Sequence, residues 1–141
     1  MRNHIINIKS SLSVIEIMTE QLGKMCNEWD ISDDVAFSMN LALEEIVTNI
    51  INHGYKGREE YPITIRFTLD KHDLRIQIKD GAPEFDPLDI PEPEDLDKPL
   101  EERNIGGLGI HLVKKFTDNF SYRRSNNKNI VTLIKHLDNG D

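Results

Sequence analysis

Glu45 and Asn49 lie four residues apart in a segment, Ser32 to about His53, whose apolar residues follow a helical period. Residues at that spacing lie on one side of a helix, so both side chains can reach one small object. A carboxylate and a carboxamide oxygen suit a hard cation such as Mg²⁺, or the positioning of a nucleophile. The alternative is an ordinary exposed polar face, which most surface helices carry.

Asp80 ends a run in which Leu74, Ile76 and Ile78 alternate with polar residues. Counting back by twos, its carboxylate shares the face of these apolar residues, which we expect to point inward. An inward carboxylate needs a hydrogen-bond donor, and the exocyclic amine of a bound base is one candidate. The alternative is a residue already in the following turn, since Gly81 comes next.

Gly106, Gly107 and Gly109 directly precede a predicted helix. Glycine lets the backbone approach a ligand closely, and a helix N-terminus offers free N–H groups to phosphate. The Gly-Lys-[Ser/Thr] of a Walker A loop does not follow, and the expected Rossmann strand does not precede. The alternative is a flexible joint.

The elements that must position these residues form the order β α α β β α β β. A helix opened by Ser10 or Ser11 precedes the Ser32 helix, and another begins near Gly107. Runs with a period of two predict a first strand and two hairpins; these strands cover 5–9, 63–69, 74–80, 120–122 and 130–137. We expect an α+β two-layer sandwich with a mixed, mostly antiparallel sheet covered on one face by three helices.

Length and composition exclude several classes of protein. The 141 residues fit one domain, 1–141, and the lone Cys26 excludes an internal disulfide. No apolar run reaches the ~18 residues of a membrane span, and no basic stripe predicts direct nucleic-acid binding. We therefore expect a reduced, cytoplasmic protein that contacts neither membrane nor nucleic acid.

The net charge of −8 is concentrated in one segment. Between Glu84 and Glu102 there are nine acidic residues and one basic residue, Lys98, so the rest of the chain is neutral overall. Five of the six prolines lie in or beside this segment. Loops of more than about 12–15 residues are usually functional lids or disordered.

Together the three motifs resemble those of the GHKL, or Bergerat-fold, ATPases. Within that group the chain is similar to the anti-sigma-factor serine kinases of the RsbW and SpoIIAB type. Glu45-Ile46-Val47-Thr48-Asn49, with His53-Gly54-Tyr55, is similar to the family's N box. The run Gly106-Gly107-Leu108-Gly109 is similar to its second glycine box. The resemblance covers nearly the whole chain.

The resemblance implies a role for each matching residue. Asn49 would hold Mg²⁺ on the phosphates of ATP, and Glu45 would act as the general base or orient the attacking hydroxyl. Asp80 would accept the adenine amino group, with Ala82 beside it in the first glycine box. The 84–106 segment would be the ATP lid. The remaining implied nucleotide contacts are Arg103, Gly106, Gly107, Leu108, Gly109 and Thr132.

The sequence departs from the family pattern at two places. The first glycine box is commonly Asp-x-Gly, but its third position here is Ala82. The Gly-Thr often seen before the last strand is missing, and Asn129 to Thr132 stands there instead. Both departures lie in the region that the resemblance assigns to adenine.

Two functions remain open from the sequence. The first is an ATP-dependent serine/threonine protein kinase that phosphorylates an antagonist protein, sequesters a sigma factor and forms a homodimer. The second is a binding module that uses nucleotide to regulate a partner without catalysis. A fragment of a sensor histidine kinase is disfavoured, because only about 30 residues precede the Ser32 helix. Gyrase-like and mismatch-repair ATPases would need further domains.

Overall fold

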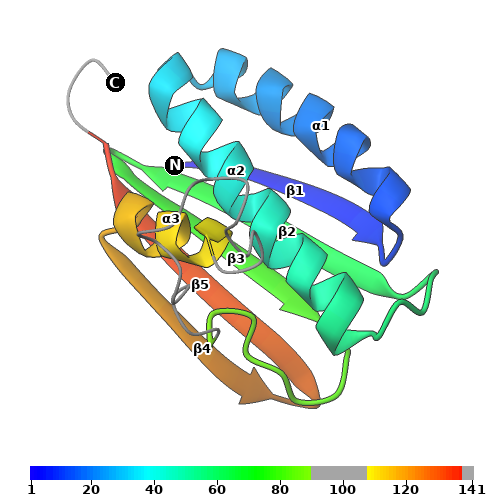
Figure 1. Cartoon of the computed structure of the whole chain (residues 1–141). Coiled ribbons are helices and arrows are strands. Elements are labelled where there is room, and N and C mark those ends of the chain that lie inside the picture. The colour runs from blue at the N-terminus through cyan, green and yellow to red at the C-terminus, as the bar shows by residue number, and fades with distance from the viewer. Residues whose placement is uncertain (90–107, 138–141) are drawn as a thin grey trace, which may run out of the picture.

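A five-stranded sheet forms one layer of the computed structural model, which describes residues 1–89 and 108–137 (Figure 1). Its spatial order is β1-β2-β3-β5-β4, and all four neighbouring pairs are antiparallel. The strands are β1 (Arg2–Lys9), β2 (Pro62–Asp70), β3 (Asp73–Asp80), β4 (Asn119–Ser125) and β5 (Lys128–His136). The predicted two-layer sandwich is confirmed, with a sheet that is antiparallel at each described pairing rather than mixed.

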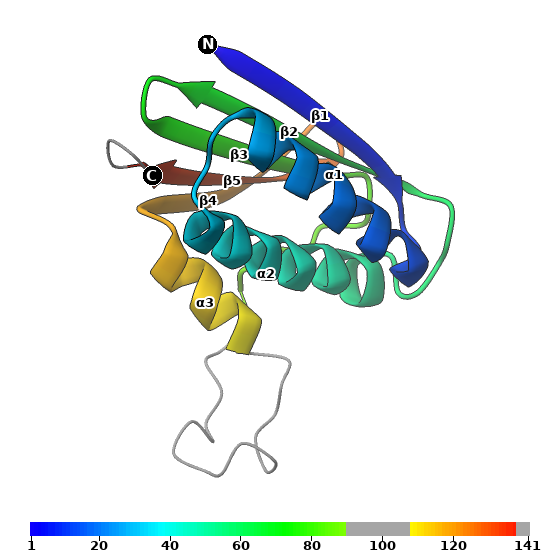
Figure 2. The same cartoon turned by 90° about the horizontal axis from the view of Figure 1, so that it is seen from above.

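Three helices, α1 (Ile15–Glu28), α2 (Asp33–Asn49) and α3 (Leu108–Phe116), make the second layer. Figure 2 shows all three on the same face of the sheet. A row of paired residues crosses the sheet beneath them, and its first four members are at most 1% exposed: Ile6, Ile65, Ile78, Val131 and, at the edge, Tyr122. Each buried aliphatic side chain contributes about 1.5–3 kcal/mol. This row forms the floor of the hydrophobic core.

The ends of α2 are set by local chemistry. Ser32 caps its N-terminus, accepting a hydrogen bond from the backbone N–H of Val35 at 3.3 Å, as predicted. At the other end the helix continues into a π-helical turn, Ile50–Gly54, in which Tyr55 N donates to Ile50 O at 2.8 Å. Single π turns are frequent at functional sites because they re-aim the following side chains.

The start of the first helix differs from the prediction. A 3-10 turn, Leu12–Val14, comes first, and α1 begins at Ile15 rather than at Ser10 or Ser11. The side chain of Ser10 is engaged elsewhere: its Oγ donates to Arg58 O at 2.5 Å and accepts from Tyr61 N at 3.1 Å. Ser10 therefore ties the end of β1 to the loop before β2.

Both predicted hairpins are present. The β4–β5 turn has positive φ at Asn126 and Asn127, 51° and 61°, which matches a two-residue hairpin turn built from asparagines.

Cys26 is buried with no disulfide among the described residues, and burial raises the pKa of its thiol to about 11. Within the described ranges, no helix is both long and apolar enough to cross a membrane.

Candidate functional site

The structure brings Glu45 and Asn49 together on the last two turns of α2. Asn49 Nδ2 donates to Glu45 Oε1 at 3.5 Å and lies 3.5 Å from the carbonyl oxygen of Pro87. The Asn49 side chain is buried, with 5% of the residue exposed. Among the described residues nothing donates to Asn49 Oδ1, so this oxygen is available to a cation or a donor.

The surroundings of Glu45 favour its neutral form. Partial burial raises the pKa of the Glu45 carboxyl, and this effect exceeds the opposing effects of the Asn49 hydrogen bond and the nearby His53. A carboxylate with a raised pKa is a better proton acceptor at neutral pH than an ordinary surface glutamate. These surroundings fit the general-base role that the resemblance implies for Glu45.

Asp80 faces the helices from the last position of β3, as its register predicted. Only 2% of the residue is exposed. Its Oδ1 accepts two hydrogen bonds of 2.9 Å, one from the backbone N–H of Ala82 and one from Asn129 Nδ2. No donor from the described part of the chain reaches Oδ2. The second carboxylate oxygen is thus free to accept a hydrogen bond from a ligand.

Burial raises the pKa of the Asp80 carboxyl. The two hydrogen bonds to Oδ1 and the nearby cations Arg124 and Lys128 act in the opposite direction. Tyr55 lies close by, because its hydroxyl accepts the backbone N–H of Gly81 at 2.7 Å. A carboxylate without such partners would be costly to bury, so these contacts keep the site polar and organised.

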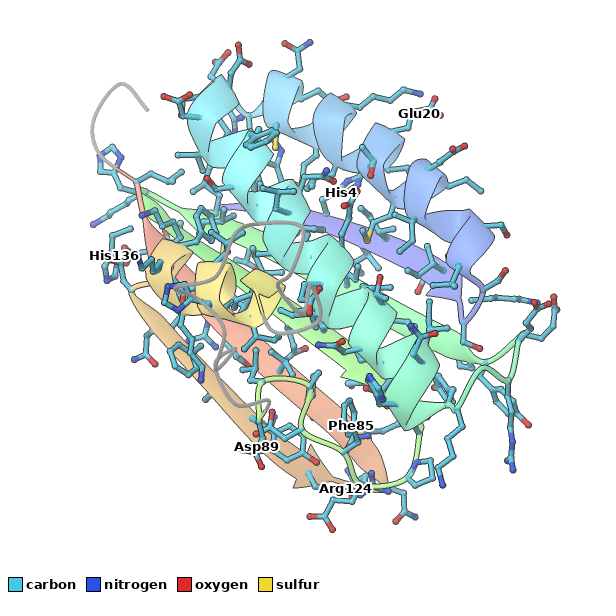
Figure 3. All side chains as sticks on the ribbon, in the orientation of Figure 1. His4, Glu20, Phe85, Asp89, Arg124 and His136 are labelled. Atoms are coloured by element: carbon cyan, nitrogen blue, oxygen red, sulfur yellow. The ribbon has the colours of Figure 1, made fainter. Side chains whose placement is uncertain are left out.

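The segment after β3 passes alongside the C-terminal end of α2. Three contacts join them: Asn49 to the Pro87 carbonyl, the rings of His53 and Phe85 at 6.0 Å, and the close approach of Gly54 to Ala82. Figure 3 shows Phe85 and Arg124 near the end of the sheet where α2 also ends. Glu45, Asn49 and Asp80 therefore border one region, although 31 residues separate Asn49 from Asp80 in the chain.

Ala82 takes the place of a glycine without strain in its own backbone. Its φ is not among the positive values of the structure, and the residue is 1% exposed. Space for its methyl group is provided by Gly54: a Cβ built at Gly54 would lie 3.3 Å from the Cβ of Ala82. The alanine at the third position of Asp-x-Gly is therefore accommodated because Gly54, at the end of the π-helical turn after α2, has no side chain.

The assignment of Thr132 to the adenine region is corrected by the strand register. Thr132 is paired with Gln77, whereas Asp80 is paired with Asn129. Directly paired residues share a face of the sheet and successive residues alternate. Thr132 therefore lies on the face away from the helices, opposite to Asp80, and Asn129 lies beside the carboxylate.

The glycine-rich segment is described only in part. Arg103, Gly106 and Gly107, and most of the expected 84–106 lid, lie outside the described residues. Leu108 and Gly109 form the first turn of α3, which packs against α2 through Ile110 and Val113. The first N–H groups of a helix have no partner within it, so this end of α3 offers donors for an anion.

Two residues beside Asp80 were missed by the sequence reasoning. Asn129 was noted only as a departure from Gly-Thr, and Arg124 was not singled out. A register drawn outward from the Asn126-Asn127 turn would have paired Arg124 with Asn129. The pairing of Asn129 with Asp80 joins β3 to β5, which no hairpin connects, so the sequence carried no local signal for it.

Comparisons with known proteins agree with this geometry. The family model described as a histidine kinase-like ATPase domain matches residues 9–135. A serine-protein kinase RsbW of Listeria monocytogenes is 30% identical over 84 residues, covering 57% of this chain and 53% of the relative. A serine-protein kinase RsbW of Bacillus cereus is 28% identical over 116 residues, covering 80% of this chain and 72% of the relative.

Solved structures give the same fold. The RsbU and RsbW domains of a Mycobacterium tuberculosis protein superpose with a TM-score of 0.67 at 14% identity, covering 97% of this chain and 33% of that one. The chain therefore belongs to the histidine kinase-like ATPase domain family, and the resemblance to RsbW-type proteins is confirmed. It spans about half of the Listeria relative and a third of the solved mycobacterial chain.

Proposed function

We propose that this protein binds Mg²⁺-ATP and transfers the γ-phosphoryl group to a serine or threonine of an antagonist protein. The family membership and the RsbW-type serine-protein kinase relatives support this proposal. The observation that carries it is a pair of oxygens, Asp80 Oδ2 and Asn49 Oδ1, that accept no hydrogen bond from any described residue and border one site. Glu45 lies one helical turn from the second of them.

Nucleotide binding follows from these two oxygens. Asp80 Oδ2 accepts the exocyclic amine of adenine, and Asn49 Oδ1 is a ligand for Mg²⁺. No cluster of three or more His, Cys, Asp or Glu side chains suited to a metal occurs among the described residues. A single protein oxygen, Asn49 Oδ1, fits Mg²⁺, which commonly takes one or two protein oxygens and completes its coordination shell with phosphates and water. Bound Mg²⁺ supplies charge neutralisation on the phosphates.

Glu45 provides the base for the transfer. Its carboxylate accepts the proton of the incoming hydroxyl as that oxygen forms a bond to the γ-phosphorus. The bond from the γ-phosphorus to the β–γ bridging oxygen breaks, and ADP leaves. Phosphoryl transfer depends mainly on positioning and charge stabilisation, which one base, one metal ligand and backbone N–H donors supply. Those donors are assigned to Gly106, Gly107, Leu108 and Gly109, with Arg103 as a further phosphate contact.

The wider role remains part of the proposal. The chain acts as one ATPase domain over 1–141 with a lid at about 84–106. It works as a homodimer in the cytoplasm, phosphorylates the antagonist and sequesters a sigma factor. The serine-protein kinase RsbW relatives support the sigma-factor and antagonist part of this role. The role amounts to transcription regulation without direct contact to nucleic acid or membrane.

Incubation with γ-labelled ATP, Mg²⁺ and an antagonist protein encoded near the gene tests the proposal. We expect label on a serine or threonine of the antagonist, and labelling slowed by about 10²–10⁴-fold when Glu45 is replaced by glutamine. Binding is tested separately by thermal unfolding: ATP at 100 times its Kd stabilises the fold by about 2.7 kcal/mol. A nucleotide-dependent shift with no label transfer would favour the non-catalytic module. No shift with the wild-type chain would contradict nucleotide binding.

A further inference from the structure

Asn129 is among the most deeply buried polar residues that the structure describes, with 1% of its surface exposed. It is the second residue of β5 and is paired with Asp80 on one side and with Arg124 of β4 on the other. All three side chains therefore project from the helix-covered face at the same end of the sheet. Asn129 is the central member of this row.

The Asn129 amide joins the turn after β3 to strand β4. Its Nδ2 lies within hydrogen-bond distance of Asp80 Oδ1 at 2.9 Å, Pro83 O at 3.1 Å and Ala82 O at 3.2 Å. Its Oδ1 accepts from Tyr122 Oη at 2.6 Å, an Arg124 guanidinium nitrogen at 2.9 Å and Phe85 N at 3.2 Å. We name the turn residues 80–85, held by this one amide, the Asp80 turn.

These contacts need both ends of a carboxamide. A carboxylate at position 129 would repel Asp80 Oδ1 and the two carbonyl oxygens, and an apolar side chain would remove one hydrogen-bond partner each from Asp80, Tyr122 and Arg124. The same Arg124 nitrogen also donates to Ala82 O at 2.9 Å, so the guanidinium supports the arrangement from β4. Asn129 and Arg124 therefore both hold the Asp80 turn, in addition to the hydrogen bond from Ala82 N to Asp80 Oδ1 within it.

We propose that Asn129 is a positioning residue that sets base selectivity through Asp80. By occupying Oδ1, it fixes the carboxylate so that only Oδ2 faces the ligand, as an acceptor. A fixed acceptor favours the 6-amino group of adenine and repels the 6-oxo group of hypoxanthine. The inference rests on the nucleotide binding proposed above and adds a residue that determines which base is taken.

Without the Asn129 amide, the Asp80 carboxylate would lose a hydrogen bond that fixes its orientation and stabilises its ionised form. Its carboxyl would then rotate or take up a proton, and a protonated carboxyl can donate to a 6-oxo group. The charged or titratable groups that face it are Arg124 from β4, Lys128 from β5 and Tyr55 from the segment after α2. All of these remain when Asn129 alone is replaced, so the change in selectivity reports on the amide.

The test compares ADP with inosine diphosphate, which differ at the 6-position of the base, by calorimetric titration. In the wild type we expect ADP to bind more tightly. In Asn129→Ala we expect the ratio of the two Kd values to fall about tenfold or more, because a hydrogen bond to a charged group is lost. Asn7→Ala, on the outer face of β1 where Asn7 Oδ1 accepts from Thr64, is the matched control and should keep the ratio.

A milder variant protects the test against misfolding. Tyr122→Phe removes one bond to Asn129 Oδ1 and keeps the amide, so its ratio should lie between those of the wild type and Asn129→Ala. The pH below which ADP binding is lost should also move upward in Asn129→Ala relative to the wild type. An equal loss for both nucleotides, or an unchanged ratio in both variants, would overturn the assignment. A wild type that binds neither nucleotide would instead refute the proposed function, and this inference with it.

Discussion

Gly54 and Ala82 face each other across the candidate site so closely that only one of them can carry a side chain without adjustment. A Cβ at Gly54 would lie 3.3 Å from the Cβ of Ala82 and 3.5 Å from the Phe85 ring. The first residue ends the π-helical turn after α2, and the second belongs to the Asp80 turn. The segment similar to the N box, which includes Gly54, therefore packs directly against the first glycine box, which includes Ala82.

Gly54→Ala should push the Asp80 turn away from α2, because Ala82 is fixed there by the hydrogen bonds to its backbone. We expect the variant to bind ADP about tenfold more weakly and to lose about 1 kcal/mol of unfolding free energy. Calorimetric titration and chemical denaturation measure the two effects.

Adding Ala82→Gly to Gly54→Ala should recover most of both losses, since the contact is removed from the other side. Residues in contact show coupling energies of about 0.5–3 kcal/mol in such cycles. Gly23→Ala in α1 is the control, because nothing lies within 4 Å of its Cβ position. Strictly additive losses in the double variant would show that the two residues act separately.

Asn49→Ala should separate metal binding from base recognition. The variant loses the only side-chain oxygen assigned to Mg²⁺, so we expect ATP affinity in the presence of Mg²⁺ to fall about tenfold or more, while affinity in the presence of a chelator changes little. Titrations with and without Mg²⁺ measure the difference.

The matched control for Asn49→Ala is Asn40→Ala on the same helix. Asn40 Nδ2 donates to Glu44 Oε1 at 3.3 Å, so it also pairs with a glutamate four positions away, although here the glutamate follows the asparagine. Asn40 Oδ1 also accepts from Thr19 of α1. It should leave nucleotide binding unchanged. Equal losses for Asn49→Ala with and without Mg²⁺ would indicate that Asn49 supports the fold of the site instead of holding the metal.

Thr132→Val should leave ADP affinity within about twofold of the wild type. Thr132 is paired with Gln77 on the face of the sheet away from the helices, so its hydroxyl cannot reach a base bound beside Asp80. The substitution keeps the shape of the side chain and removes only the hydroxyl. A large loss of affinity measured by titration would contradict the strand register described here.

Periodicity was enough to predict the elements and the sides on which Glu45, Asn49 and Asp80 lie. The i to i+4 spacing placed Glu45 beside Asn49, and alternation along β3 placed Asp80 inward; the structure agrees on both. These are local relationships, fixed by helix and strand geometry within one element. The three helices and two hairpins were predictable for the same reason.

Contacts between different helices, strands and turns could not be predicted from the spacing of residues within each element. Thr132 and Asn129 lie three positions apart on one strand, and residues an odd number of positions apart point to opposite faces of the sheet. A shift in register of one residue is likewise enough to move a side chain to the other face. The contact of Ala82 with Gly54 and the bonds of Arg124 depend on how the Asp80 turn packs against α2 and β4. Such packing follows from the whole fold, which motif spacing does not encode.

The pH dependence of the reaction should follow Glu45. Burial raises the pKa of its carboxyl, so the proton-accepting form is lost at a higher pH than for an exposed glutamate. We expect the transfer rate to fall as the pH is lowered through this raised pKa, so that activity is lost at a higher pH than for an ordinary glutamate base. Glu45→Gln should slow transfer by about 10²–10⁴-fold and remove this dependence. Single-turnover rates with the antagonist protein measure both effects.

The raised pKa of Glu45 also predicts how the stability of the fold depends on pH. Transfer activity should fall as the pH is lowered, whereas the contribution of Glu45 to stability should become more favourable. Because the folded-state pKa of Glu45 lies above its unfolded value, the folded chain binds the proton more tightly than the unfolded chain does. Ionised Glu45 therefore destabilises the fold at neutral pH, and this penalty disappears as the pH falls toward the unfolded value. Glu45→Gln should raise the thermal unfolding temperature at neutral pH while it slows transfer. Glu44→Gln, whose carboxylate accepts from Asn40 and Thr19, should not raise it. A Glu45→Gln variant that is less stable than the wild type at neutral pH would show that the ionised carboxylate stabilises the fold.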